Sequence, residues 1–418
     1  MNSILQFFTH FRELVSRGAY VFLANILEKA TFFFLFLLFA RSLPIEYFGL
    51  ITASFAVANI MISLFEGGFN FYIQRAVASK EDLLLNRINQ IFTLRIILIV
   101  PYLMLSLFYF IFFTHPVLLL STIIILAIAF YSLNNLCNAI YFGLHRYKTV
   151  FLLLSVSRFV LVVAFIVARA MGKSPEFITA TFLLSGIIHF IILLIALRKE
   201  GYKLQFTRIH FETIKTIFKS SLPMGMGIIL VWVYDRADTV LIQSILGDHP
   251  VAFYAVAYSI YKAPQAFANI ILTPLFTEFS GIFAQKGFIP KDNFLKKFLM
   301  LSLIAAVFTA TVFFTAKIFI LFFYRMIYIN SVGLLTVLVF ALPGLIWNNF
   351  TGITLNAAKK ERLATFSVFI AVIVNLLLNT GLLLHYKNVY AAVAATVITE
   401  YLIFLIQLFY ILKYKLLR

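Results

Sequence analysis

The segment "SLPMGMGIILVWVYDRADTVLIQSIL" (Ser221–Leu246) places Asp235, Arg236 and Asp238 within four residues of an otherwise apolar run. On a membrane-insertion scale, a charged residue at the centre of a helix costs about 2.5–3.5 kcal/mol, whereas a large apolar residue returns only about 0.3–0.6 kcal/mol. The roughly ten Leu, Ile and Val residues here return about 3–6 kcal/mol against roughly 8–10 kcal/mol for the charges. The segment therefore predicts a helix whose charges face a helix bundle or a hydrated cavity rather than lipid.

The composition of the whole chain is that of an all-α integral membrane protein. Of its 418 residues 63% are hydrophobic and 12% are charged, whereas soluble proteins are about half apolar and one-quarter charged. The single cysteine, Cys137, excludes a disulfide within the chain. The net charge of +18 falls between apolar runs, which favours anionic lipid head groups as partners and argues against nucleic acid.

Apolar runs long enough to cross about 30 Å of hydrocarbon recur along the chain. They predict twelve transmembrane helices, over residues 18–40, 47–70, 91–113, 117–140, 150–171, 176–197, 221–246, 251–280, 298–324, 331–356, 362–384 and 389–412.

The basic residues predict how these helices are oriented. Of the 34 Lys and Arg residues, 23 fall in one set of loops and at the two termini, and five fall in the opposite set. Because Lys and Arg accumulate on the cytoplasmic side, both termini are expected to be cytoplasmic. Residues 198–220 combine basic residues with apolar ones at helical spacing, so we expect an amphipathic linker along the membrane surface; an ordinary solvated basic loop is the alternative.

The chain also shows an internal repeat. Three polar signatures recur in the same order, at offsets of 207, 212 and 214 residues: Glu28–Lys29 with Asp235–Arg236, Glu66 with Glu278, and Asn134–Asn135 with Asn348–Asn349. With six helices per half, both halves start on the same side of the membrane. We therefore expect an N-terminal lobe (1–197), the linker (198–220) and a C-terminal lobe (221–418) as parallel repeats around a central cavity.

Ionisable residues near the middle of predicted helices are the candidate site. They are four bases and four acids: Lys29, Arg158, Arg236, Lys262, Glu28, Asp235, Asp238 and Glu400. Asp235 and Asp238 share a helix face that Arg236 does not, so Lys262 is expected to neutralise one aspartate and leave Arg236 available to an anion. Ion pairs that only fix helix packing are the alternative. The equal numbers leave the sign of the cargo open, although guanidinium favours phosphate.

Other polar residues give weaker signals. Asn375 and Asn379 lie four residues apart and are expected to bond between helices. The seven histidines lack metal-binding spacing, and no glycine-rich phosphate loop is present. The sequence therefore predicts neither a metal, nor a cofactor, nor transport driven by the protein's own ATP hydrolysis.

Three segments resemble bacterial O-antigen and polysaccharide flippases of the multidrug/oligosaccharidyl-lipid/polysaccharide (MOP) exporter superfamily. They are "LLFARSLPIEYFGLITASFAVANIMISLFEGGFNFYIQRAVA" (Leu37–Ala78), the region Ser221–Ser280 with its mid-helix Asp and Tyr-Ala-x-Ala segment, and "LNAAKKERLATFSVFIAVIVNLLLN" (Leu355–Asn379). The likeness is diffuse and covers nearly the whole chain. One departure is "SLPIEYFG" (Ser42–Gly49), which lacks the glycine common after the leucine and leaves the local turn in doubt.

The resemblance implies a flippase, not an enzyme, in the bacterial inner membrane. Its expected substrate is an undecaprenyl-pyrophosphate-linked oligosaccharide, moved to the outer leaflet by alternating access. Matched by position, Lys29, Arg236, Lys262 and Arg158 would bind the substrate. The acids Asp235, Asp238, Glu28 and Glu400 would carry coupling protons or sodium ions. Partners of such a flippase include a polysaccharide polymerase and a chain-length regulator.

Two other functions remain open from the sequence. A multidrug or cation exporter of the same superfamily would bind its cargo with the acids and use the bases structurally. A membrane polysaccharide polymerase is disfavoured because polymerases need a sizeable outward loop, and the predicted outward loops, such as "GDHP" (Gly247–Pro250), are short.

Overall fold

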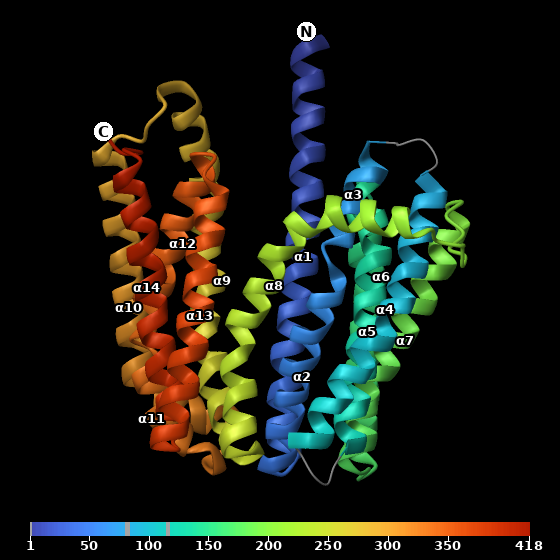
Figure 1. Cartoon of the computed structure of the whole chain (residues 1–418), viewed down its shortest axis with the longest axis vertical. Helices are drawn as coiled ribbons and strands as arrows, with labels where there is room; N and C mark the ends of the chain where they lie inside the picture. The colour runs from blue at the N-terminus through green and yellow to red at the C-terminus, as the bar shows by residue number, and fades with distance from the viewer. Residues whose placement is uncertain (1, 80–83, 114–117) are drawn as a thin grey trace. The chain divides into compact units, whose positions relative to one another are not determined.

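A computed structural model describes the backbone of residues 2–79, 84–113 and 118–418, and the side chains of these residues except 2–18, 224, 266 and 269. The described chain is helical (Figure 1). The helices are α1 (Asn2–Ser42), α2 (Ile45–Glu66), α3 (Phe69–Ala78), α4 (Leu84–Phe113), α5 (Leu118–Gly143), α6 (Tyr147–Ala170), α7 (Pro175–Lys199), α8 (Phe211–Leu246), α9 (Asp248–Lys286), α10 (Lys291–Tyr324), the 3-10 turn η1 (Met326–Tyr328), α11 (Asn330–Leu338), α12 (Ala341–Ala357), α13 (Glu361–Tyr386) and α14 (Tyr390–Lys413).

The helix count confirms the predicted all-α membrane class. In the described part of the chain, nine helices are long and apolar enough to cross a membrane, or up to 12 if each of three bent pairs is one span. The bends lie in α8 (59°), in α9 (44°) and between α11 and α12 (41°). Pro343 explains the bend between α11 and α12, because proline has no N–H to donate to the carbonyl of Val339, one turn earlier.

Several predicted helix boundaries are wrong. The helices α1, α4 and α10 begin at Asn2, Leu84 and Lys291 rather than at residues 18, 91 and 298. The helix expected over 47–70 ends at Glu66, because Gly67 and Gly68 adopt positive φ angles of 52° and 78°, and the separate helix α3 follows. In α3 the buried residues fall at helical spacing on one face: Phe69, Tyr72, Ile73, Ala76 and Val77. The helix expected from residue 221 begins earlier, at Phe211, so the second half of the predicted linker forms the start of α8.

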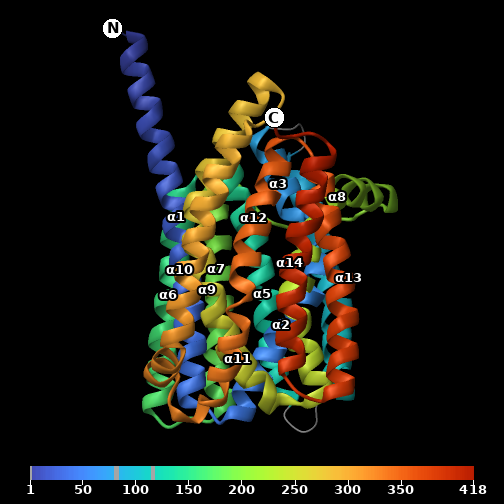
Figure 2. The same cartoon turned by 90° about the vertical axis from the view of Figure 1, so that its left-hand side faces the viewer.

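By packing, the chain divides into two compact units. We call residues 1–43 and 54–229 the N-terminal unit, and residues 44–53 and 230–418 the C-terminal unit. In the first, α5 and α6 pack against α7; in the second, α12 and α13 pack against α14 (Figures 1 and 2). These helices correspond in chain order, so the two units share one packing plan, as the predicted repeat requires. The lobe boundaries at 197/198 and 220/221 stay a prediction, since the units are defined by packing.

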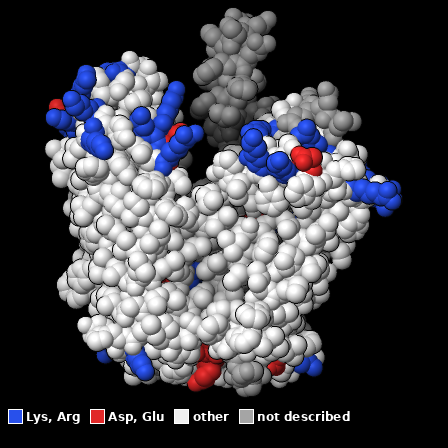
Figure 3. Space-filling view, in the orientation of Figure 1, with Lys and Arg blue, Asp and Glu red and all other residues white. Residues whose placement is uncertain are grey.

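Each unit is apolar along its sides and basic at one end. Large apolar side chains such as Phe159, Phe314 and Leu377 are exposed, as expected where lipid rather than water is the solvent. Lys and Arg gather at one end of each unit (Figure 3). The distribution fits helices that end at a membrane surface.

A close backbone approach fixes the break between α2 and α3. A Cβ atom added at Gly68 would lie 2.5 Å from the carbonyl oxygen of Ser221 and 2.8 Å from the backbone nitrogen of Gly225. A Cβ at Gly225 would in turn lie 2.6 Å from the carbonyl carbon of Gly67. Because backbone atoms cannot move aside as side chains can, glycine is required at both faces of this contact.

Gly68→Ala is expected to destabilise the protein by at least about 2 kcal/mol, since it adds both a positive-φ penalty and a backbone clash. The measurement is the apparent unfolding temperature of the purified protein in detergent. Gly381→Ala is the matched control, because a Cβ there meets nothing within 4 Å inside α13. Equal unfolding temperatures for the two variants would contradict the close approach.

Candidate functional site

The charges of α8 and their neighbours form one group of candidate residues, in the C-terminal unit. Lys262 of α9 donates to Asp235 with Nζ 2.9 Å from Oδ1, and Tyr258 donates to the same oxygen at 3.3 Å. The Lys262 ammonium also lies over the rings of Tyr258 and Tyr261, 5.5 and 5.8 Å from their centroids. The expected pairing of Lys262 with one aspartate is confirmed. The pair is partly open, with side chains 18% and 36% exposed.

Asp238 lies one turn further along α8 and has a different environment. It is 4% exposed and accepts hydrogen bonds from Tyr254 (2.7 Å), Thr396 (2.6 Å) and Asn379 (2.8 Å). These donors come from α9, α14 and α13, and all are neutral. No Lys or Arg side chain lies within 4 Å of this carboxylate in the described part of the chain. Asp238 is thus a buried acid held by neutral donors.

Two asparagines complete the surroundings of Asp238. The expected bonding of Asn375 and Asn379 between helices is confirmed, because Asn379 reaches Asp238 and Asn375 donates to Thr399 at 3.3 Å. Their own side-chain oxygens, however, are buried and have no hydrogen-bond donor among the described residues. Asn379 thus turns its amide nitrogen, not its oxygen, toward the carboxylate.

Glu400 of α14 is a second buried acid of this kind. It is 1% exposed and accepts hydrogen bonds from Tyr261 (3.1 Å) and from the amide of Asn348 on α12. Within the described residues it has no basic side chain in ion-pair contact. Asp238 and Glu400 are therefore the predicted acids without a paired base.

Arg236 differs from the other bases of the site. Its guanidinium lies over the ring of Trp232, 5.9 Å from the centroid. Its Nε is buried without an acceptor, and its guanidinium makes no ion pair with any described acid. This is the arrangement expected from the helix geometry, in which Arg236 points away from Asp235 and Asp238.

The N-terminal unit holds the other predicted residues. Arg158 of α6 lies 3.1 Å from Glu28 of α1 and also donates to the hydroxyl of Tyr131 on α5. The guanidinium stacks 4.8 Å from the Tyr131 ring centroid and 5.3 Å from that of Phe32. Lys29, the neighbour of Glu28, is exposed. Glu28 and Arg158 are thus brought together, while Lys29 stands apart from this pair.

A further ionic network was missed from the sequence. Arg95 of α4, which is 1% exposed, contacts Glu66 and Ser132 and donates to the Phe65 carbonyl at 3.1 Å. The repeat had marked Glu66 but not its base, which a search for a basic residue on the following helix would have found. In the C-terminal unit, the corresponding pair is Glu278 and Lys297, at 3.2 Å.

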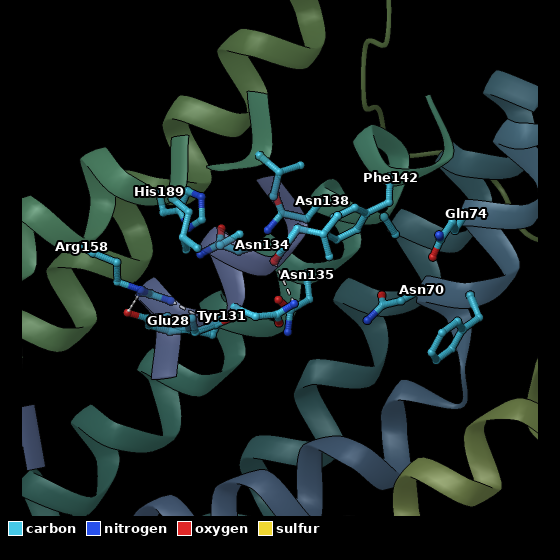
Figure 4. A pocket seen from close by; sticks show the side chains of 17 residues that line it. Glu28, Asn70, Gln74, Tyr131, Asn134, Asn135, Asn138, Phe142, Arg158 and His189 are labelled. Atoms are coloured by element: carbon cyan, nitrogen blue, oxygen red, sulfur yellow. Dashed lines mark hydrogen bonds and ion pairs between the residues drawn. The ribbon is translucent and has the colours of Figure 1, made fainter. Parts of the chain in front are cut away.

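A polar pocket in the N-terminal unit was also missed. It has a volume of about 270 Å³ and lies among α1, α3, α5, α6 and α7 (Figure 4). Six side-chain amides line it: Asn25, Asn70, Gln74, Asn134, Asn135 and Asn138. Uncharged amides stand out less than charged residues when the hydrophobicity of a segment is averaged. The closely spaced Asn134, Asn135 and Asn138 on one helix were nevertheless a usable signal.

Comparison with known proteins places this geometry in context. The model of a family described as "Polysaccharide biosynthesis protein" matches residues 7–280. No curated protein sequence matches the chain.

Solved membrane transporters have the same fold. The lipid II flippase MurJ in an inward closed conformation is 16% identical, with a TM-score of 0.73, and 97% of this chain and 88% of that chain are covered. An inward-facing multidrug resistance MATE family transporter of the MOP superfamily is 13% identical, with a TM-score of 0.70, covering 94% and 95%. The eukaryotic MATE transporter AtDTX14 is 11% identical, with a TM-score of 0.64 and 96% of both chains covered.

Lys262→Met is expected to lower the apparent unfolding temperature, because it leaves the Asp235 carboxylate without its base inside the bundle. Lys297→Met is the comparison variant: it breaks the ion pair with Glu278, in which the lysine is more exposed than Lys262, 31% against 18%, and an exposed pair contributes at most about 1 kcal/mol. Adding Asp235→Asn to Lys262→Met is expected to restore part of the loss. Equal effects of the two lysine variants would contradict this account of the pair.

Proposed function

The chain belongs to the family of polysaccharide biosynthesis proteins within the MOP exporter superfamily, and we propose that it flips an undecaprenyl-pyrophosphate-linked oligosaccharide. The cargo would be an O-antigen or other surface polysaccharide repeat unit. It would move from the cytoplasmic to the outer leaflet by ion-coupled alternating access. Members of this superfamily are transporters, which supports a function other than catalysis.

Arg236 is the observation that carries the proposal. It sits on a membrane-spanning helix, is half-buried, and makes no ion pair within 4 Å with any described acid. An unpaired charge at such a position is costly and marks a ligand or ion pathway. A guanidinium presents parallel N–H donors that match two oxygens of a phosphate group. A pyrophosphate is a fitting partner for this residue.

The other bases differ in how available their donors are to the substrate. Lys29 is exposed on α1 and available to an anion. Lys262 has three ammonium donors and a single side-chain acceptor, Asp235, among the described residues. Arg158 directs its donors to Glu28 and Tyr131, so a substrate contact by Arg158 would require it to leave Glu28.

The acids divide in the same way. Glu28 and Asp235 are paired with bases, which leaves Asp238 and Glu400 as the residues to take up a coupling proton or cation. A small hard cation at Asp238 would require the donors Tyr254, Thr396 and Asn379 to turn from the carboxylate and present their oxygens, because carboxylate, hydroxyl and amide oxygens are its preferred ligands. A coupling proton would need no such rearrangement.

The membrane environment completes the proposal. The basic end of each unit (Figure 3) would face the cytoplasm and anionic lipid heads in the bacterial inner membrane, with both termini on that side. A polysaccharide polymerase and a chain-length regulator would receive the flipped product. The bends in α8, in α9 and between α11 and α12 are the places where the helices would change angle between the two states.

Arg236→Ala is expected to abolish delivery of surface glycan in cells that depend on this chain, while the amount of membrane-inserted protein stays unchanged. Arg236→Lys should retain part of the activity, since it keeps the charge and loses the bidentate geometry. Lys317→Ala, which removes an exposed base of α10, serves as the control with normal glycan.

Normal glycan in Arg236→Ala cells would overturn the assignment of Arg236 to the pyrophosphate. Cation or drug efflux that persists in this variant, but is lost in Asp238→Asn, would favour the exporter alternative. Sugar transfer by the purified protein would revive the polymerase alternative.

Asp238→Asn is expected to uncouple transport from the driving ion. In proteoliposomes, the flipping rate of a fluorescent lipid-linked oligosaccharide is measured with and without a gradient of protons or of sodium ions, in each direction. The wild type should flip the lipid faster under one of these gradients, and the variant should show the same rate with and without that gradient. Asp292→Asn, on the exposed first turn of α10, is the control. Retained acceleration in the Asp238 variant would contradict a coupling role.

A further inference from the structure

The amides that line the pocket of the N-terminal unit have no part in the pyrophosphate and ion contacts proposed above. Besides the six amides, it is lined by Glu28, Arg158 and His189, and by the rings of Phe71 and Phe142 (Figure 4). Its volume of about 270 Å³ is close to the lower end of small-molecule pockets, which run from about 300 to 1,000 Å³. A single ring-sized polar group fits such a space.

The charges at the wall of the pocket cancel one another. Glu28 and Arg158 form an ion pair at 3.1 Å, and the remaining polar groups are neutral amides, the Tyr131 hydroxyl and the His189 imidazole. A phosphate or another fully charged group would have to break this pair to be neutralised. The pocket therefore favours an uncharged polar ligand.

Several polar atoms of the pocket are buried without a partner. They are the side-chain oxygens of Asn70, Asn134 and Asn138 and both ring nitrogens of His189, none of which has a hydrogen-bond partner among the described residues. An unsatisfied buried polar atom costs about 1–3 kcal/mol. Groups that carry several O–H donors and acceptors on one rigid ring can satisfy many such atoms at once.

The matching position in the C-terminal unit is ionic. Asn134 of α5 and Asn348 of α12 are related by the offset of 214, and the same offset relates Gly186 of α7 to Glu400 of α14. Asn348 donates to the Glu400 carboxylate, whereas Asn134 donates to the backbone carbonyl of Gly186 at 3.1 Å. At this matching position the acceptor is a carboxylate in one unit and a backbone carbonyl in the other.

We propose that this pocket binds one uncharged sugar ring of the cargo, with the amides of α3 and α5 hydrogen-bonding its hydroxyl or acetamido groups. The inference rests on the proposed function and adds a saccharide subsite to it. Phe71, which is 42% exposed, and Phe142 offer apolar ring faces against which the C–H face of a sugar packs. The pocket would thus select the sugar ring.

Asn138→Leu is the decisive variant. The Asn138 amide lines the pocket, its oxygen is buried without a partner, and no hydrogen bond to it is seen from the described residues. Leucine has a similar shape and removes an unsatisfied amide, so the variant should fold with an unchanged or higher unfolding temperature. A residue with a purely structural role would not combine intact stability with lost binding.

The measurement is the Kd of the purified protein in nanodiscs for three probes: undecaprenyl pyrophosphate alone, and the same lipid carrying a single N-acetylglucosamine or a single galactose. The wild type should bind at least one sugar-bearing probe more tightly than the bare lipid. Asn138→Leu should reduce this gain by about three- to tenfold, the worth of a lost neutral hydrogen bond or two. Its Kd for the bare lipid should be unchanged.

Asn349→Leu is the matched control. Asn349 lies on α12, the counterpart of α5, and its amide donates to the Leu345 carbonyl at 2.7 Å within its own helix. This variant should keep the full gain from the sugar. The proposal is overturned if Asn138→Leu keeps the gain, or if it weakens all three probes equally.

The failure of the proposed function is distinguishable from failure of the pocket. If the wild type binds none of the three lipids, the flippase proposal fails. Free N-acetylglucosamine and galactose then test the pocket directly: a rise in the unfolding temperature of the wild type, absent in Asn138→Leu, supports the subsite. No rise with either sugar overturns it.

Discussion

The cost of placing ionic groups in hydrocarbon is the constraint on which this structure depends. Each unit meets this cost internally, with Glu66 against Arg95 in one and Asp235 against Lys262 in the other. Such pairs stabilise the bundle little compared with apolar packing, but a pair that loses one partner becomes strongly unfavourable. These pairs therefore determine which helices pack together. Arg236 of α8 makes no ion pair with a described acid, so it is available to an anionic ligand.

The internal repeat shows how one scaffold serves two chemistries. Both units pack corresponding helices in the same way, and an asparagine at matching positions donates across to the neighbouring helix in each. The acceptor is the carboxylate of Glu400 in one unit and the backbone carbonyl of Gly186 in the other. The packing differs with the residue type, because a Cβ atom added at Gly186 would lie 3.3 Å from Phe130 Cβ and 3.3 Å from the Tyr131 ring.

How much could be predicted from the sequence depends on the free-energy cost of placing each residue inside a membrane. The spans and the pairing of Lys262 with an aspartate were predictable, because insertion energies and helix spacing act locally. The break at Gly67 and Gly68 was not, because it depends on a backbone contact with α8, far along the chain. Arg95, the partner of Glu66, was missed because it lies on another helix, α4. The amide pocket escaped notice because neutral amides contribute little to a hydropathy count, and only the fold brings them together.

An unpaired Arg236 also gives the cargo a means to drive a conformational change. A ligand shifts an equilibrium only by the difference between its affinities for the two states. Glu28 and Arg158, which pair with each other within the N-terminal unit, would contribute to that difference only if one state separated them. A half-buried guanidinium without an acid lowers its free energy when an anion arrives, and α8, which carries it, is bent by 59°. Under the proposed alternating access, anion binding at Arg236 and the bend would therefore be coupled through one helix.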